Sequence, residues 1–396
     1  MKAHVCLFYL LSVLISSCGK SQDNNPKDLF KKCSIIAAKT VVEGDTLVTC
    51  DISAVKQSIL LPLSLYTDSL EVIKLDSREE ALVGKASVTV SKNFLGIYDF
   101  KNCSYKLFTR KGKFLHTIGA IGQGPGEYKL LYDNQIDEEN NRIYLFPWTT
   151  KKVLVYDLDG NFIQDIPLPR LVHKGCFKVD TAQKQMSVLN LPFMGTPLAW
   201  LQDFDGNVIS EKMTPHIEFM PDYGHEIMNI SSGNLMKFSL LRLPATADSL
   251  YHYNGTRNQL LPAFTTTFNE EMPVHYFLET PHFYSVDIIG PSTDPDYTGT
   301  VNKRIIVDKQ TLRGGYYQLI ADELGGISFE KSGYYEYGCI LSIEPGILLE
   351  RIEKQLSTPE KLSSNAKKLL MNLKNSISGD DNNYIIMGKW KNSESL

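Results

Sequence analysis

The stretch KLFTRKGKF at Lys106–Phe114 combines a short β-rich segment, a turn and a second β-rich segment. The same pattern returns as VLVYDLDGNF at Val153–Phe162 and as WLQDFDGNV at Trp200–Val208, with looser copies LYHYNG at Leu250–Gly255 and IIVDKQ at Ile305–Gln310. Glycine or asparagine at the turn supplies the positive φ that a tight β-turn requires. Each copy therefore predicts a β-hairpin.

The hairpins recur at an almost constant spacing. Their turn glycines Gly112, Gly160, Gly206 and Gly255 lie 48, 46 and 49 residues apart. A period of about 40 to 50 residues, with room for four short strands per unit, is typical of the blades of a β-propeller. Residues 86–308 also show little helical periodicity. We therefore expect an all-β fold, a six-bladed β-propeller.

Each hairpin is interpreted as the third and outermost strands of one blade. Inner strands are expected upstream, at Ala86–Val90 with Phe94–Asp99 for the first blade and at Asn134–Asp137 with Arg142–Phe146 for the second. Five hairpins leave one blade to be assembled from both ends of the chain, which would leave no exposed sheet edge. The segments expected to form it are Gly326–Phe329, Tyr334–Ile343, Tyr384–Lys389 and Ser69–Leu75.

A helical insertion interrupts the late strands, at about residues 345–378. Thr358 is expected to cap its helix, and Pro359 suits the first helical turn. The apolar side chains that would share one face of this helix are Leu362, Ala366, Leu369, Leu373 and Ile377. We interpret it as a helix packed on the side or base of the propeller rather than as a functional lid.

The N-terminus has the pattern of a lipoprotein signal. Met1–Ser17 has a cationic start and an apolar run too short for a stable membrane anchor, and Ile15–Gly19 (ISSCG) places small residues before a cysteine. We expect Cys18 to carry lipid and anchor the protein to the outer membrane, because Gly19 is not the aspartate of an inner-membrane retention signal. The alternative is an ordinary secretory signal with a chance cysteine. The expected organisation is a signal peptide (residues 1–17), a tether (18–45) and a propeller (46–396).

Charge and cysteine content limit the other possibilities. The net charge of -4, without a long basic run, argues against a nucleic-acid partner. Of the seven cysteines, Cys6 lies in the signal peptide and Cys18 is expected to carry lipid. The other five are scattered without a CxxC pair, so neither a zinc site nor a disulfide framework is indicated. A bridge from Cys33 to Cys50 stays open as an alternative to buried free thiols. We expect no metal and no cofactor.

Four segments resemble a known group: SLEVIKL at Ser69–Leu75, FTRKGKFLHTI at Phe108–Ile118, GQGPGEY at Gly122–Tyr128 and VYDLDG at Val155–Gly160. They are similar to the six-bladed β-propeller lipoproteins of Gram-negative bacteria, which are related in fold to NHL-repeat and TolB-like propellers. The resemblance implies a propeller in the cell envelope. The resemblance implies no catalytic residues, because this group of proteins has no catalytic residues in common.

One face of the propeller is expected to hold the ligand site. GQGPGEY lacks the following helix and the Lys-Ser/Thr pair of a phosphate loop, so it is interpreted as the crossing from the first blade to the second. That crossing shares a face with the turn PWTTK at Pro147–Lys151. The side chains expected to open onto this face are Gln123, Glu127, Tyr128, Trp148 and Lys151. An aromatic ring beside polar groups suits a sugar or a peptide. The alternative is that Tyr128 and Trp148 only pack between blades.

The leading hypothesis is a non-enzymatic lipoprotein that binds a peptide, a glycan or a partner protein. The alternative is an enzyme of the lyase or lactonase type with its site at the central channel, because fold alone does not fix function. No catalytic residue is singled out. The segment HEIMN at His225–Asn229 lacks the second histidine of the HExxH motif, and we interpret it as a surface loop.

Overall fold

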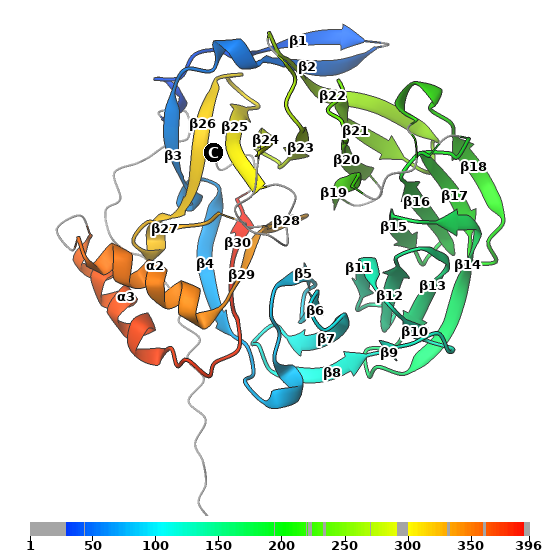
Figure 1. The fold of residues 1–396 in the computed structure, drawn as a ribbon, viewed down its shortest axis with the longest axis horizontal. Coiled ribbons are helices and arrows are strands. Elements are labelled where there is room, and N and C mark those ends of the chain that lie inside the picture. Colours follow the sequence, from blue (N-terminus) through cyan, green and yellow to red (C-terminus); the bar gives the residue numbers. More distant parts are fainter. Residues whose placement is uncertain are drawn as a thin grey trace, which may run out of the picture.

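Six sheets of mainly antiparallel strands form a ring around a central axis (Figure 1). The computed structural model describes residues 29–391, apart from residues 43, 194, 219, 221–223, 233–234, 270, 291–299, 331–332 and 359–361. The expected signal peptide and Cys18 lie outside the described residues. Within the described ranges, no helix is long and apolar enough to cross a membrane.

Blades one to three each use four consecutive strands, with the first strand innermost. The expected hairpins form the third and fourth strands of these blades, as the sequence predicted. Blade one contains β5 (Ala86–Val90), β6 (Phe94–Asp99), β7 (Ser104–Thr109) and β8 (Phe114–Ile118). Blade two contains β11 (Leu131–Asp137), β12 (Arg142–Pro147), β13 (Thr150–Tyr156) and β14 (Phe162–Val172). Blade three contains β15 (Gly175–Asp180), β16 (Gln185–Asn190), β17 (Ala199–Asp203) and β18 (Val208–Lys212).

Blades four and five are widened by strands from the N-terminal region. Blade four contains β19 (Glu226–Ser232), β20 (Leu235–Leu241), β21 (Ser249–Asn254) and β22 (Gln259–Thr267), followed by β2 (Asp45–Asp51) and β1 (Ala37–Val42). Blade five contains β23 (His275–Glu279), β24 (Phe283–Gly290), β25 (Thr300–Asp308) and β26 (Gly314–Ala321). On its outer edge, β26 pairs with β3 (Ser58–Pro62) and β27 (Ile327–Ser328). Gly326–Phe329 therefore extends blade five, and its assignment to the last blade was wrong.

Blade six joins the two ends of the folded chain. It contains β28 (Gly333–Tyr335), β29 (Gly338–Ile343), β30 (Tyr384–Trp390) and, outermost, β4 (Thr67–Lys74). Ile386 of β30 lies opposite Val72 of β4 in this antiparallel pair. The late strand thus pairs with the early one, as the sequence predicted, and hydrogen bonds between strands far apart in sequence close the ring.

The helical insertion consists of two helices instead of one. They are α2 (Pro345–Leu356) and α3 (Ser364–Ser376). Ser363 caps α3 by accepting a hydrogen bond from the backbone N–H of Ala366 at 3.1 Å. Thr358 follows the end of α2, so its expected role as a cap was wrong, and Pro359 lies outside the described residues. Leu348, Ile352 and Leu370 are buried in the core between blades five and six, which places both helices on the side of the ring.

Short elements fill the connections between blades. Ala120–Ile121 (β9) pairs in parallel with Glu127–Tyr128 (β10). The 3-10 helices are η1 (Ile52–Ala54), η2 (Leu63–Leu65), η3 (Glu79–Ala81), η4 (Pro215–Ile217) and η5 (Asp322–Leu324). The segment GQGPGEY runs between β8 and β11, so it is the crossing from blade one to blade two that the sequence predicted.

Apolar side chains between neighbouring blades form the core. Between blades two and three, for example, Phe146, Phe177 and Trp200 are buried in one cluster. Burying a side chain of this size contributes roughly 2 to 3 kcal/mol. Part of the expected tether joins such a cluster, because Phe30 and Cys33 are buried against blades five and six. Packing on the propeller therefore begins well before residue 46.

The five cysteines of the described region are free thiols, and Cys33 and Cys50 do not form a disulfide. Cys33 and Cys50 belong to different hydrophobic clusters, one between blades five and six and the other between blades four and five. Burial raises the pKa of Cys50 to about 12. The Cys33 and Cys50 thiols therefore act as small apolar side chains of the core.

Candidate functional site

The innermost strand of every blade begins on the same face of the ring, which we call the top face. The crossings between blades and the turns between second and third strands meet there. In blade two, Leu131 at the start of β11 lies opposite Pro147 at the end of β12. The backbone N–H of Trp148 donates to the carbonyl oxygen of Leu130 at 2.9 Å. The turn that carries Trp148 is thereby fixed beside the first strand of its blade.

A charged cluster occupies the top face between blades two, three and four. The ammonium group of Lys174 lies 2.5 Å from Oε1 of Glu226 and donates to the carbonyl oxygen of His225 at 2.8 Å. The Tyr132 hydroxyl donates to Oε2 of the same glutamate at 2.7 Å. The Lys174 side chain is only 1% exposed, whereas that of Glu226 is 38% exposed. The Glu226 carboxylate is therefore fixed in place, with its charge paired to Lys174 and part of its surface open to solvent.

Trp148 completes this cluster. Its ring lies under the Lys174 ammonium, 4.8 Å from the ring centroid, and meets the Tyr132 ring edge-on at 6.4 Å. A cation over an aromatic face gains electrostatic energy, and more so when it is shielded from water. The indole is half-buried. It is thus held in one orientation with part of its surface left open.

The propeller repeat explains why these side chains meet. Tyr132 is the second residue of β11, Lys174 directly precedes β15, and Glu226 is the first residue of β19. They occupy nearly equivalent positions in three consecutive blades, so closure of the ring brings them together. The surface-loop interpretation of HEIMN was wrong, since His225 is buried and Glu226 begins a strand. Aligning the start of each repeat would have singled out Lys174 and Glu226.

Below the cluster, side chains of β11 bond to the backbone of β15. Oδ2 of Asp133 accepts from the N–H of Phe177 at 3.0 Å, and Oε1 of Gln135 accepts from the N–H of Val179 at 3.0 Å. Burial raises the pKa of Asp133 to about 7, although hydrogen bonds from backbone N–H groups act in the opposite direction. This ladder holds the first strands of blades two and three in register.

Three of the five expected site residues, Gln123, Glu127 and Tyr128, lie within the crossing itself. Tyr128 is 3% exposed, and its hydroxyl accepts from the N–H of Tyr105 at 3.0 Å and donates to the carbonyl oxygen of Ile118 at 2.9 Å. Glu127 accepts from the N–H of Gly124 at 2.8 Å. Figure 1 shows β9 and β10 at the outer rim, between β8 and β14. Tyr128 therefore occupies the position described by the packing alternative.

Apart from Glu127 and Tyr128, the expected site residues are partly or fully accessible. Gln123 and Lys151 are exposed, and Trp148 is half-buried. Gln123 belongs to the crossing at the outer rim, whereas Trp148 contacts Tyr132 and Lys174 beside the innermost strands. Trp148 is thus the expected residue that the structure brings into the charged cluster.

Besides Trp148, exposed apolar side chains lie in top-face loops of blade one and in the crossing to blade two. They are Leu130, Phe100 and Leu82, which are 38%, 49% and 41% exposed. Phe100 donates from its backbone N–H to the carbonyl oxygen of Lys85 at 3.0 Å, and the carbonyl oxygen of Leu82 accepts from the Lys106 ammonium at 2.6 Å. We call Leu82, Phe100, Leu130 and Trp148 the hydrophobic row. None of them was predicted from the sequence except Trp148, because isolated apolar residues in turns carry no periodic signal.

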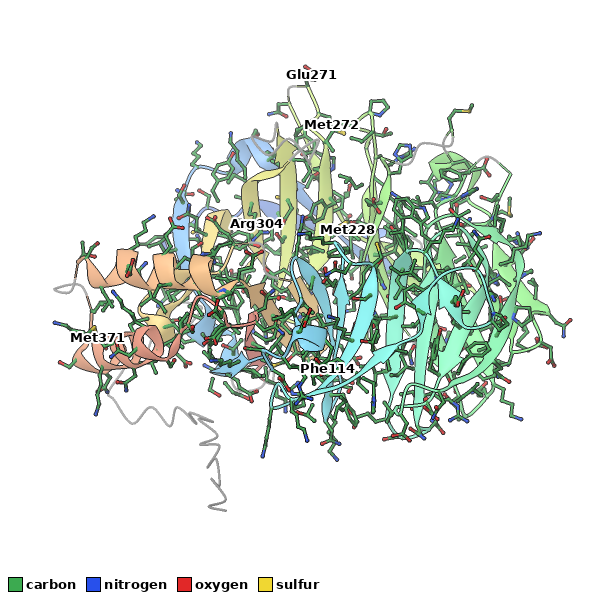
Figure 2. The ribbon with its side chains drawn as sticks, turned by 60° about the horizontal axis from the view of Figure 1, so that its bottom comes forward. Phe114, Met228, Glu271, Met272, Arg304 and Met371 are labelled. Atoms are coloured by element: carbon green, nitrogen blue, oxygen red, sulfur yellow. The ribbon has the colours of Figure 1, made fainter. Side chains whose placement is uncertain are left out.

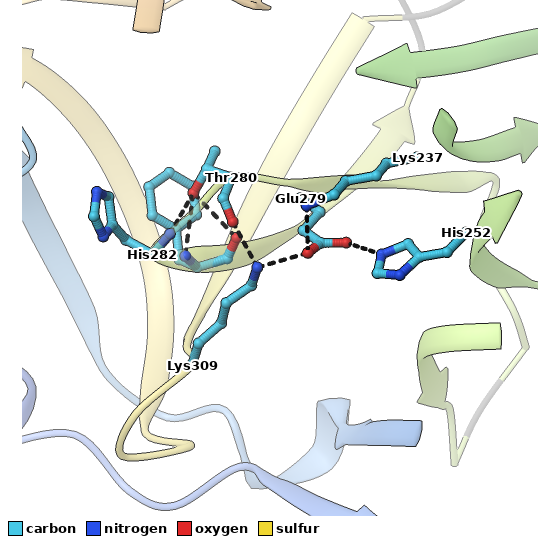
Figure 3. Close-up of polar contacts among 7 residues, drawn as sticks. Lys237, His252, Glu279, Thr280, His282 and Lys309 are labelled. Atoms are coloured by element: carbon cyan, nitrogen blue, oxygen red, sulfur yellow. Dashed lines mark hydrogen bonds and ion pairs between the residues drawn. The ribbon is translucent and has the colours of Figure 1, made fainter. Parts of the chain in front are cut away.

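A second charged cluster lies at the end of β23, opposite the face on which the innermost strands begin. Figure 3 shows its contacts. Glu279, 5% exposed, receives Lys309 at 2.7 Å, Lys237 at 3.0 Å and Nε2 of His252 at 2.5 Å. Lys237 and His252 belong to blade four, whereas Glu279 and Lys309 belong to blade five. The buried carboxylate thereby joins the two blades. In the described part of the chain, no group of three His, Cys, Asp or Glu side chains could hold a metal ion.

This ring of six sheets, four of them four-stranded and two widened to six strands, is closed by β4 and β30 and defines the protein as a six-bladed β-propeller. The chain belongs to the family described as Domain of unknown function (DUF4934), whose profile matches residues 47–389. No curated protein matches it.

Two solved structures from Bacteroides are similar. One, from Bacteroides fragilis NCTC 9343, is described as an exported protein; it is 18% identical, with a TM-score of 0.57 over 85% of this chain and 99% of its own. A member of the DUF4221 family from Bacteroides vulgatus ATCC 8482 is 10% identical, with a TM-score of 0.48 over 82% of this chain and 97% of its own. At these identities the likeness concerns the fold alone.

Proposed function

We propose that this protein is an outer-membrane lipoprotein, anchored through Cys18, whose propeller binds an extended peptide segment of a partner protein on its top face. The observation that carries the proposal is the fixed, half-exposed ring of Trp148 at the end of the hydrophobic row. Aromatic side chains fixed beside polar groups are favoured anchors for a ligand, because they lose little conformational entropy on binding.

The chemistry of the top face favours a peptide over a glycan. The hydrophobic row offers several apolar positions in succession, whereas a sugar is usually stacked on a single ring. An extended chain places alternate side chains on one side, so it can contact successive members of such a row. Beside the row, the exposed carboxylate of Glu226 can accept a hydrogen bond from a backbone N–H or pair with a cation of the ligand.

The proposed location in the outer membrane rests on the sequence. Ile15–Gly19 has the residues of a lipidation site. The segments similar to six-bladed propeller lipoproteins, which are related in fold to NHL-repeat and TolB-like propellers, support the same assignment. Two or three acyl chains bind a bilayer far more firmly than one, at about 0.8 kcal/mol per buried methylene. Labelling with an alkynyl fatty acid tests the anchor. We expect label on the wild type and none on Cys18→Ala; label on the variant would contradict the anchor.

Binding is tested on the full Cys18→Ala chain with a random dodecapeptide library and a glycan array. We expect peptides rich in apolar residues to be selected, with affinity reduced at least tenfold by Trp148→Ala, since a buried aromatic anchor contributes about 2 kcal/mol or more. Phe162→Ala is the matched control, because Phe162 is exposed on the outermost strand of blade two. Equal losses in both variants, or binding to glycans only, would overturn the peptide assignment.

A further inference from the structure

Blade five opens between its third and fourth strands. β25 and β26 pair only at Ile305 with Tyr316 and at the two positions nearest their turn. Farther from this turn, β25 continues to pair with β24. β26 instead pairs with β3 along its opposite edge, where Gln318 lies opposite Leu60. Arg304 and Tyr317, the next residues of the two strands, therefore no longer face one another as a ladder pair.

An open cavity of about 530 Å³ adjoins this separation. β25 contributes Lys303 and Arg304 to its wall, β26 contributes Tyr317 and Gln318, and β3 contributes Ser58 together with apolar side chains. Cavities of roughly 300 to 1,000 Å³ accommodate small-molecule ligands. The size and the mixed lining suit a compact organic ligand.

Arg304 is held in place by a buried carboxylate. Its Nε lies 3.1 Å from Oδ2 of Asp287, which is 1% exposed. Asp287 also accepts from the hydroxyls of Ser285 at 2.5 Å and Tyr276 at 3.2 Å. A carboxylate with three donors is fixed in orientation, and it fixes the guanidinium in turn. Figure 2 labels Arg304 among the strands of blade five.

The charge of the lining indicates the kind of ligand. Among the described residues that line the cavity, Arg304 and Lys303 are cations and none is a carboxylate. Asp287 offsets the charge of Arg304 from behind, so Lys303 leaves the described part of the cavity lining with a net positive charge. The Lys303 ammonium stands 5.8 Å from the centroid of the Tyr316 ring at the cavity wall. Ser58, Tyr317 and Gln318 add neutral groups that can donate hydrogen bonds.

We propose that this cavity is a second binding site, which takes a small organic anion with an apolar body and a carboxylate or phosphate group. The anionic group binds in the opening between β25 and β26, between Arg304 on the face of β25 that carries Asp287 and Lys303 on the face that carries Tyr316; the apolar body lies against Leu60 and Tyr316. The site is independent of the hydrophobic row on the top face, and its occupant does not depend on the peptide ligand proposed there.

Calorimetric titration of the full Cys18→Ala chain with benzoate, phenyl phosphate and benzamide tests this proposal. We expect benzoate or phenyl phosphate to bind at millimolar concentration and benzamide to bind at least tenfold more weakly. Because a hydrogen bond to a charged group is among the stronger contacts to a ligand, Arg304→Gln should weaken binding at least tenfold. Whichever anion binds more tightly identifies the ligand as a carboxylate or a phosphate.

A second variant separates binding from folding. Arg304→Gln leaves Asp287 without its cation, whereas Ser58→Asp adds a negative charge at the cavity wall without breaking that buried pair. We expect Ser58→Asp to abolish anion binding and Trp148→Ala to leave it unchanged. If neither anion binds the parent chain, if benzamide binds equally well, or if Ser58→Asp binds normally, the proposed site is wrong. A failure of peptide binding on the top face would not affect this result.

Discussion

The carboxylate of Glu279 in blade five lies 3.0 Å from the ammonium of Lys237 in blade four. The two side chains, 5% and 20% exposed, link neighbouring sheets at the end where the innermost strands finish. Lys309 and His252 share the same carboxylate (Figure 3). The single buried carboxylate of Glu279 therefore pairs with both the Lys237 and the Lys309 ammonium groups.

Glu279→Gln should therefore destabilise the protein strongly. Removing one partner from a buried ion pair leaves the remaining charges uncompensated and costs about 3 to 5 kcal/mol. Urea denaturation of the wild type and the variant measures the difference. Asp165→Asn is the matched control, because its pair with Lys152 is 2.9 Å long but 36% exposed on both sides. The control should change stability by about 1 kcal/mol or less. A similarly small effect of Glu279→Gln would contradict the role of the Glu279 carboxylate in joining blades four and five.

The same carboxylate should make the protein sensitive to acid. Burial alone would raise the pKa of Glu279, but the bond from His252 and the charges of Lys309 and Lys237 outweigh it and hold the pKa well below its usual range. For an acid with a lowered native pKa, the stabilisation is complete above the unfolded value of about 4.3 and is lost as the pH falls towards the native value. The difference in unfolding free energy between the wild type and Glu279→Gln should shrink as the pH falls below about 5. A difference that stays constant down to pH 3 would contradict this.

Asp133 should give the opposite dependence. Burial raises its pKa to about 7, above the unfolded value of about 3.9. The native state therefore holds a proton that the unfolded chain has released, and stability is lost as the pH rises from about 4 through 7. Asp133→Asn keeps an acceptor for the N–H of Phe177 but cannot ionise. We expect its advantage over the wild type to grow between pH 5 and 8 in urea denaturation; parallel profiles would show that the Asp133 carboxyl is not perturbed.

Local sequence predicted the hairpins but not the cluster on the top face. The turn residues of KLFTRKGKF and its copies determine their own backbone conformation, so their pattern is visible in a short window. Tyr132 and Glu226, in contrast, are 94 residues apart in the chain and meet only because three blades stand side by side. The boundary of α3 was missed for a local reason: Thr358 and Ser363 are both acceptable caps, and packing of the helix decides between them.

Substitution of Gly160 measures how much free energy a side chain costs at the positive φ of the hairpin turn. Its φ is +86°, and a Cβ added there would meet no atom closer than 3.5 Å, so only the backbone conformation opposes a side chain. Gly160→Ala should cost about 1 kcal/mol or slightly more. Gly379→Ala is the control, since Gly379 lies outside the left-handed region and a Cβ there would meet nothing within 4 Å. Melting temperatures of the two variants should differ by a few degrees, and equal values would mean that the turn relaxes without strain.

Gly388 tests how the ring is closed. It lies opposite Leu70 in the pairing of β30 with β4, and a Cβ at this position would come within 2.8 Å of Cγ2 of Thr67 and 3.0 Å of Cδ2 of Leu70. Gly388→Val should push β4 away from β30 and cost about 1 to 3 kcal/mol, as overpacked cores do. Gly333→Ala on β28 is the control, because the nearest atom to its Cβ would lie 3.7 Å away. Hydrogen exchange should show faster exchange of the β4 amides in Gly388→Val than in the control. Unchanged exchange in β4 would mean that this strand does not depend on its contact with β30, and the ring would then be closed by other contacts.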